Sequence, residues 1–184
     1  PMAIIDLMAT LGSSLDTIPF SKIEDLIEYF DISKFSSNSP KFDVDDIANL
    51  NRKILHTKPY EEIQNYGISR EAFEIIHENI DSYNDFAVWK EILTPGYSSN
   101  FTPNESEKAV INLFAEEIKN TSDFAEESLK DVLNLVKNKL NIKAKELYIP
   151  IRKALTNQEH GPNLIQLIIL LGKNEAYNRL INLK

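Results

Sequence analysis

The sequence predicts an all-α protein, and three observations support this prediction. Apolar residues recur three or four positions apart in every segment that shows a pattern, which is the spacing of one helix face. Glycine occurs only 5 times in 184 residues, although an all-β sandwich or barrel needs many turn residues. Several segments also begin with residues that favour a helix N-terminus, such as Ser, Thr, Asp or Pro. We therefore expect helices throughout the chain and no sheet.

The first part of the chain consists of short predicted helices. One begins at Pro1 and ends at Gly12, and the next begins at a capping box over residues 21–24. Their expected buried faces contain Ile4, Ile5, Met8 and Leu11 in the first helix, and Ile23, Leu26, Ile27 and Phe30 in the second. Three more helices are expected to start after Asp43, Pro59 and Ser69. The last apolar group before a break covers residues 86–93.

Residues 94–100 form the clearest break in the chain, because they combine turn dipeptides with small polar residues. We place a domain boundary here, with one helical subdomain over residues 1–95 and a second over residues 96–184. The second restarts with Thr102 as a helix cap and Glu105 three residues later. Further helices are expected over residues 124–140, 147–155, 162–171 and 175–183.

Charge is distributed unevenly along the chain. The formal net charge of −8 would by itself count against a nucleic-acid partner. Residues 1–129, however, carry a net −14, whereas residues 130–184 carry a net +6. Phosphate binding depends on the potential within a Debye length of about 8–10 Å, so the C-terminal third has the charge to bind an anionic polymer. The alternative is a solvated basic helix face without a partner.

Several kinds of site are excluded or not expected. The chain has no cysteine, which excludes disulfides, thiolate metal ligands and cysteine catalysis. Its three histidines, His56, His77 and His160, share no metal-ligand spacing, so we expect no metal site. Glycine-rich nucleotide motifs and nucleophile motifs are absent, and no apolar stretch reaches the roughly 18 residues of a membrane span. Nothing in the sequence predicts catalysis by this chain.

Residues 147–164, which read LYIPIRKALTNQEHGPNL, are the most distinctive segment. They resemble the signature L-Y/F-x-P-L/I-R-x-A-L-T-G-x-x-x-G-P-x-L near the end of bacterial glutamyl-tRNA synthetases. Residues 170–175 resemble the L-L-G-K-E that follows it in that family, and residues 1–12, 30–34 and 42–51 resemble three upstream segments in the same order. One departure is Asn157, which stands where the family usually has glycine.

The resemblance implies that the chain is the C-terminal part of a class I glutamate–tRNA ligase, and we expect it to be a fragment. A connecting domain would end near residue 95, and an α-helical-cage anticodon-binding domain would follow. A Rossmann-type catalytic domain in cis would use ATP and Mg, while this fragment holds no cofactor. The implied partner is tRNA-Glu, with tRNA-Gln left open, and we expect a cytoplasmic monomer that binds neither membranes nor DNA.

The resemblance also implies the site. Arg152 has a planar guanidinium that suits base edges and phosphates, and Gly161 allows close approach of the backbone. Thr156 begins the polar loop between them, and Leu164 would pack against a base. The tRNA phosphates would be held by Lys143, Lys145 and Lys153.

Other interpretations of these residues stay open at this point. Arg152 could form a surface salt bridge with Glu146 or Glu159, and Leu164 fits a core position as well as a contact. Aromatic residues near the break, including Trp89 and Tyr97, fit a core or hinge better than a stacking surface. For the chain as a whole, the alternatives are a helical protein-interaction module without RNA binding and a small all-helical enzyme.

Overall fold

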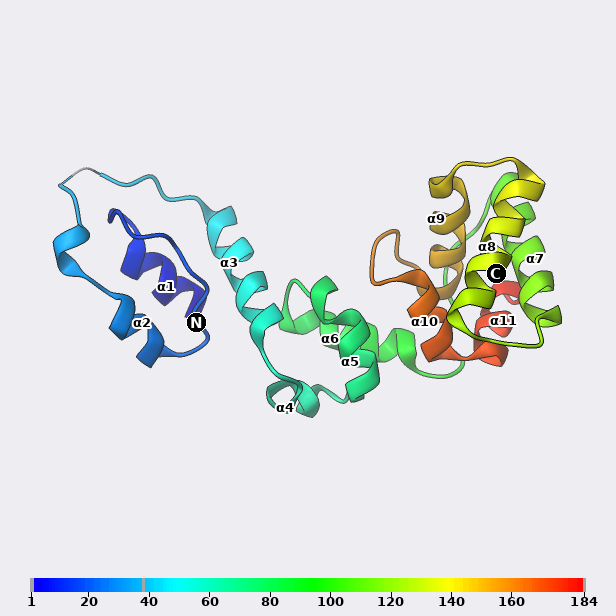
Figure 1. Cartoon of the computed structure of the whole chain (residues 1–184), viewed down its shortest axis with the longest axis horizontal. Helices are drawn as coiled ribbons and strands as arrows, with labels where there is room; N and C mark the ends of the chain where they lie inside the picture. Colours follow the sequence, from blue (N-terminus) through cyan, green and yellow to red (C-terminus); the bar gives the residue numbers. More distant parts are fainter. Residues whose placement is uncertain (1, 38, 184) are drawn as a thin grey trace. The chain divides into compact units, whose positions relative to one another are not determined.

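The computed structural model describes residues 2–37 and 39–183, and the secondary-structure elements of these residues are helices joined by loops (Figure 1). These residues form eleven α-helices and three short 3-10 helices, with no strand beyond one isolated bridge between Ser13 and Phe35. The all-α prediction is therefore confirmed. Pro1, the predicted first helical residue, lies outside the described residues.

The chain divides into two compact units, which are described separately below. The first unit comprises residues 1–70 and 77–87, and the second comprises residues 71–76 and 88–184. The boundary expected after residue 95 falls within the second unit. Since compact packing does not by itself define a functional domain, that boundary stays a prediction.

The first unit is built from short helices around a small core. Its elements are α1 (Met2–Thr10), α2 (Ile23–Tyr29), α3 (Val44–Thr57), α4 (Tyr60–Ile63) and the start of α6 (Tyr83–Leu93), with 3-10 turns at Ile32–Lys34, Gln64–Tyr66 and His77–Asn79. Helix α1 packs on α3, and the buried residues between them are Ala3, Leu7, Leu50 and Ile54. The small Ala3 side chain allows α1 and α3 to approach closely.

The predicted buried face of α1 is wrong. The buried residues are Ala3, Asp6, Leu7 and Thr10, whereas Ile4 and Met8 are 53% and 60% exposed. Both sets recur three or four positions apart, so helical periodicity fits either face equally well. The position of α3 decides between them, and this is a tertiary property.

The predicted start of α2 is also wrong. The helix begins at Ile23 with Lys22 at the N-cap and no side-chain cap, so the expected capping box from Ser21 to Glu24 does not form. Only Leu26 of the expected apolar face is buried, while Ile23, Ile27 and Phe30 are exposed. The start lies one residue later than a Ser21 cap would require.

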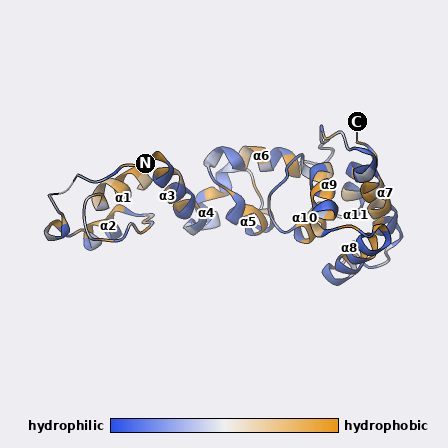
Figure 2. Ribbon diagram, turned by 90° about the horizontal axis from the view of Figure 1, so that it is seen from above, coloured by the Kyte–Doolittle hydropathy of each residue, from blue (hydrophilic) through white to orange (hydrophobic). Residues whose placement is uncertain are grey.

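The second unit is a bundle with a large apolar core. It contains α5 (Arg70–Ile76) apart from its first residue, the end of α6, α7 (Glu105–Asn120), α8 (Glu126–Leu140), α9 (Ala144–Thr156), α10 (Leu164–Leu171) and α11 (Lys173–Ile181). Helix α7 packs against α8, α9 and α11. Fully buried side chains from these helices include Phe114, Ile118, Leu129, Leu133, Leu147, Ile151 and Leu155. Figure 2 shows hydrophobic and hydrophilic residues along the same helices, as amphipathic packing requires.

Helix α7 begins two residues later than predicted. Asn104 is its N-cap, and it forms a capping box with Glu107: the Asn104 side chain accepts from Glu107 N at 3.0 Å, and Glu107 Oε2 accepts from Asn104 N at 2.9 Å. The predicted pair, Thr102 and Glu105, has the same spacing, so the sequence contains two overlapping capping signals.

Two kinds of feature do not occur among the described residues. None of their helices combines the length and the apolar character that crossing a bilayer requires. Nor does any group of three or more His, Asp or Glu side chains in this part of the chain come together in a way that could hold a metal ion.

Asp6 is an unfavourable feature of the first unit. Its side chain is fully buried in α1, where Oδ2 accepts from Phe20 N at 2.9 Å and Oδ1 has no hydrogen-bond partner. Burial raises the pKa of Asp6 above its ordinary value, because desolvation disfavours the carboxylate. The folded state therefore binds the proton more tightly than the unfolded state, so stability falls as pH rises from about 4 through the folded pKa.

We expect Asp6→Asn to raise the free energy of unfolding at pH 7 by about 1 kcal/mol, because it removes a buried charge that has one unpaired oxygen. The gain should shrink as the pH falls through the folded pKa towards about 4, and it should be absent below that pH, where Asp6 is protonated in both states. Urea unfolding between pH 3 and 8 measures this, with Asp16→Asn on the exposed surface of the same unit as a control. A gain that does not change with pH would contradict the interpretation.

Candidate nucleic-acid interface

Helix α9 carries most of the predicted site, and both of its ends are fixed by hydrogen bonds. At its start Glu146 Oε2 accepts from Lys143 N at 2.7 Å. At its end Asn157 adopts a left-handed conformation with φ of 60°, and its N–H donates to Lys153 O at 2.8 Å. Asn is among the few non-glycine residues that tolerate this conformation. Asn157 therefore ends α9 in the left-handed conformation that a glycine at this position would also adopt readily.

Thr156 is buried at the end of α9 and holds the loop that follows this helix through hydrogen bonds. Its side chain is fully buried, and its hydroxyl donates to Arg152 O at 2.8 Å and accepts from Gln158 N at 3.1 Å. Its carbonyl oxygen accepts from the Tyr97 hydroxyl at 3.1 Å. The hydroxyl of Thr156 thus has both of its partners within the chain.

Arg152, Gly161 and Trp89 come together in the second unit, and we call these three residues the Arg152 cluster. A Cβ atom at Gly161 would lie 3.1 Å from Arg152 Nη1 and 3.4 Å from two carbons of the Trp89 ring. Gly161 has a φ of 156°. This position therefore needs glycine both for its backbone and for the close approach of its two neighbours.

The guanidinium of Arg152 is half-buried and has no carboxylate partner among the described residues. Its Nη1 atom is buried without a hydrogen bond. The two carboxylates considered as partners are engaged elsewhere: Glu146 accepts at the start of α9, and Glu159 pairs with Lys153 at 2.5 Å. Burial lowers the pKa of Arg152, but its ordinary pKa is so high that it remains charged. The result is a partly desolvated cation that is not neutralised.

Two of the three residues after Gly161 are buried, and Asn163 between them is exposed. Pro162 is buried, and Leu164 is 3% exposed within the apolar core of the unit. Helix α10 begins at Leu164, two residues later than predicted, because Asn163 is its N-cap and accepts from Ile165 N at 2.9 Å. The structure thus places Leu164 beneath the loop.

The three candidate phosphate-binding lysines differ in their surroundings. Lys143 and Lys145 are exposed, and neither ammonium forms an ion pair with a described carboxylate. Lys153 pairs with Glu159, and its Nζ lies 5.5 Å from the centre of the Phe101 ring. Lys153 is thus the least available of the three.

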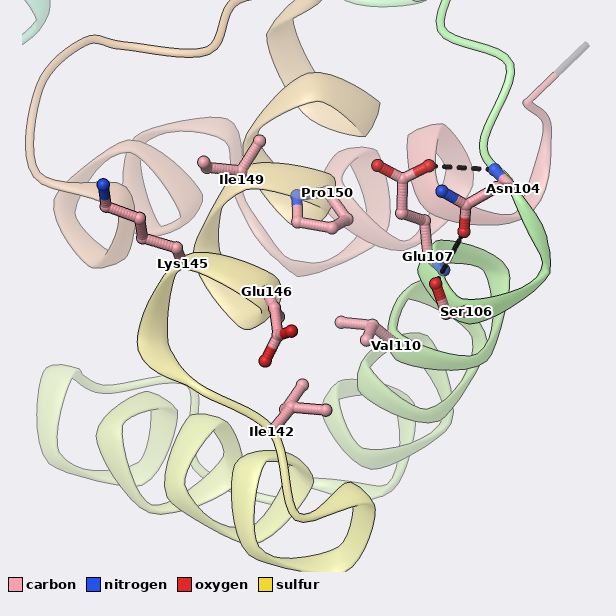
Figure 3. A pocket seen from close by; sticks show the side chains of 9 residues that line it. All are labelled: Asn104, Ser106, Glu107, Val110, Ile142, Lys145, Glu146, Ile149 and Pro150. Atoms are coloured by element: carbon pink, nitrogen blue, oxygen red, sulfur yellow. Dashed lines mark hydrogen bonds between the residues drawn. The ribbon is translucent and has the colours of Figure 1, made fainter.

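Lys145 lies on the rim of a separate hollow of about 330 Å³ between the starts of α7 and α9 (Figure 3). Its apolar lining consists of Val110, Ile142, Ile149 and Pro150. Glu107 and Glu146 also line it, and one oxygen of each caps a helix N-terminus. Figure 3 shows the Lys145 ammonium directed away from both carboxylates. Their negative charge disfavours a phosphate inside the hollow, so Lys145 is suited to one outside it.

Sequence analysis missed a buried arginine near this site. Arg179 is 5% exposed and donates to Glu175 and to three backbone carbonyl groups. Its spacing of four residues from Glu175 was a usable signal for a helical ion pair, but not for burial. Trp89, which belongs to the Arg152 cluster, is 5% exposed and therefore has a core position.

We expect Gly161→Ala to disturb the Arg152 cluster directly, because the new methyl group would contact Arg152 Nη1 and the Trp89 ring. Overpacking of this kind costs about 1–3 kcal/mol. Trp89 is the single tryptophan, so its fluorescence emission reports on this contact.

Gly172→Ala is the matched control, because Gly172 also has a positive φ of 77° but has no atom within 4 Å of the new Cβ. It should lower stability and leave the Trp89 emission maximum unchanged. Identical emission spectra for Gly161→Ala and the unmodified chain would rule out the contact.

Comparison with known proteins relates this chain to a family. The model of the anticodon binding domain matches residues 46–183. Glutamate–tRNA ligase 1 of Zymomonas mobilis is 30% identical over 183 residues, which are 98% of this chain and 41% of that protein. The enzyme of the same name from Ehrlichia ruminantium strain Gardel is 31% identical over 185 residues, with the same two shares.

A solved structure shows the same fold. The glutamate tRNA ligase from Elizabethkingia meningosepticum, in complex with its amino acid, superimposes with a TM-score of 0.70 at 19% identity, covering all of this chain and 41% of that one. The chain thus spans about two fifths of the length of the curated relatives it matches. Because the family model covers most of its residues, the chain belongs to the anticodon-binding domain family.

Proposed function

We propose that this chain is the tRNA-reading part of a glutamate–tRNA ligase and that it binds the anticodon loop of tRNA-Glu. The observation that carries the proposal is the guanidinium of Arg152, which is partly desolvated, has no carboxylate partner in the part of the chain that the structure describes, and lies against Gly161. The parent enzyme would attach glutamate to tRNA in the cytoplasm as a monomer. Its catalytic domain in cis would use ATP and Mg, and charging of tRNA-Gln remains open.

Anticodon bases suit this site because they are unpaired and can be turned out of the loop. Arg152 offers several N–H donors in one plane, which fits the acceptor edge of a base or a phosphate. Because Nη1 is already buried in the free protein, part of the guanidinium's desolvation free energy is included in folding and does not oppose binding. Binding therefore gains hydrogen bonds and charge attraction at a smaller additional desolvation cost.

The other predicted site residues have different roles in this proposal. Gly161 brings the loop backbone close to the bound base. Thr156 and Leu164 are buried, so they shape the loop from beneath: Thr156 through its two hydrogen bonds and Leu164 through core packing. Lys143 and Lys145 would contact phosphates as they stand, and Lys153 would do so after leaving Glu159.

Apolar side chains on the first unit support a partner in cis. Ile4, Met8 and Ile27 are all more than half exposed on α1 and α2. The first unit carries 13 of the 18 large apolar side chains that are exposed among the described residues, and a concentration of this kind is typical of an interaction surface. We propose that the catalytic part of the ligase covers them.

We expect Arg152→Ala to weaken binding of the tRNA-Glu anticodon stem–loop by about 10- to 100-fold, the range for one lost base contact of about 1–3 kcal/mol. Its preference over a stem–loop with altered anticodon bases should fall as well. Fluorescence anisotropy with a labelled stem–loop measures both. Stability should not decrease, because the variant removes a buried donor that has no partner.

Lys145→Ala is the matched control for Arg152→Ala. A lost phosphate contact should weaken binding of all stem–loops equally and reduce the slope of log affinity against log salt by about 1. If Arg152→Ala keeps the full preference for the cognate anticodon, or behaves like Lys145→Ala, the proposed base contact is wrong.

We expect Glu159→Gln to strengthen binding several-fold at low salt, because it frees the Lys153 ammonium and removes a negative charge beside the loop. Lys153 lowers the pKa of Glu159, so the pair is intact at neutral pH. Affinity should therefore show no Glu159-dependent change between pH 6 and 8. Weaker binding by Glu159→Gln would show that the pair is needed for the shape of the loop.

A further inference from the structure

We propose that Arg179 is a positioning residue of this site, which holds the end of α9 against the end of α6 and thereby fixes the Arg152 cluster. The inference rests on the proposed function, because it concerns how the same site recognises its anticodon. Arg179 lies on α11, and its hydrogen-bond partners among the described residues include none of the three residues of the cluster.

The first step is the set of hydrogen bonds that Arg179 makes. Nη1 donates to Ile92 O on α6 at 2.8 Å and to Leu155 O on α9 at 3.0 Å. Nη2 donates to Thr94 O, just after α6, at 3.1 Å. Nε donates to Glu175 Oε1 at 2.7 Å. The guanidinium of Arg179 on α11 therefore links the end of α6 to the end of α9 through backbone carbonyl groups.

The second step is the position of these bonds relative to the Arg152 cluster. On α6, Ile92 lies three residues after Trp89, and on α9, Leu155 lies three residues after Arg152. Arg179 thus joins α6 and α9 about one helical turn beyond Trp89 and Arg152. These are the two side chains that Gly161 lies against. A change in this connection would alter the spacing of Trp89 and Arg152.

The third step is that neighbouring contacts also hold the segment after α6 against α11 and the end of α9. Glu175 Oε1 also accepts from Gly96 N at 2.9 Å. The Arg179 guanidinium lies 5.1 Å from the centre of the Tyr97 ring, and the Tyr97 hydroxyl donates to Thr156 O. Ser99 Oγ donates to Lys153 O at 2.7 Å. The segment that connects α6 to α7 is therefore attached to the last turn of α9 at several points.

Only arginine among the cationic residues fits these partners. Its planar fork reaches a carboxylate on one side and carbonyl oxygens on the other, whereas a lysine ammonium is a single point with three donors on a flexible stem. Substitution by lysine keeps the charge but leaves some of the buried carbonyl oxygens without their donor.

The test compares Arg179→Lys and Tyr97→Phe with the unmodified chain. We expect both variants to shift the Trp89 emission maximum and Arg179→Lys to reduce the preference for the cognate stem–loop by about tenfold, the lower part of the range for one lost base contact. The salt dependence of binding should stay unchanged, because the exposed lysines are not affected. Leu180→Ala, on the same helix and in the same core, is the control for general destabilisation.

The outcomes separate a positioning role from a structural one. If Leu180→Ala lowers stability as much as Arg179→Lys but keeps the emission maximum and the preference, positioning is supported. If Arg179→Lys is folded with unchanged emission and unchanged preference, the inference is overturned. If Arg179→Lys does not fold, Tyr97→Phe decides by the same two measurements. If the unmodified chain binds no stem–loop, the proposed function fails, and the Trp89 emission alone then tests whether Arg179 fixes the cluster.

Discussion

The cation at Arg152 is partly removed from water and has no carboxylate partner among the described residues, and the candidate site depends on this arrangement. A buried donor without a partner is unfavourable, so a fold without another use for it would place a carboxylate there or replace the arginine. Two glutamates lie close in sequence, yet Glu146 caps the start of α9 and Glu159 binds Lys153. An acceptor for the part of the Arg152 side chain that stays accessible is therefore best supplied from outside the chain.

Such a site requires a rigid surrounding, because the guanidinium is not held by an ion pair of its own. The structure meets this need with backbone contacts. Thr156 closes the last turn of α9 onto the loop, and Asn157 ends the helix in a left-handed conformation. Gly161 lies so close to Arg152 and Trp89 that a Cβ atom there would contact both of them. Arg179 then connects α9 to α6 through carbonyl oxygens, which are fixed by the helices themselves.

Sequence reasoning predicted the helical class and the existence of the five C-terminal helices, because their apolar spacing is regular and their packing partners are close in the chain. It failed where two local signals were equivalent. Periodicity fits the Ile4 and Met8 face of α1 as well as the Ala3 and Leu7 face, and two overlapping capping signals compete at the start of α7. At the site, the residue types of Arg152 and Gly161 were informative. The contact with Trp89 and the role of Arg179 come from residues that lie 24 to 87 positions away from their partners, and no local pattern encodes them.

The charge distribution and the geometry of Arg152 contribute to recognition in different ways. Exposed lysines such as Lys143 and Lys145 attract any polyanion, and their effect weakens with salt. The acidic remainder of the chain, with net −14 over residues 1–129, opposes the same attraction elsewhere on the protein. A half-buried guanidinium is screened less by salt and offers its donors in one plane only. In the proposed function the lysines therefore bring RNA to this unit, whereas discrimination between anticodons depends on how accurately the chain holds Arg152.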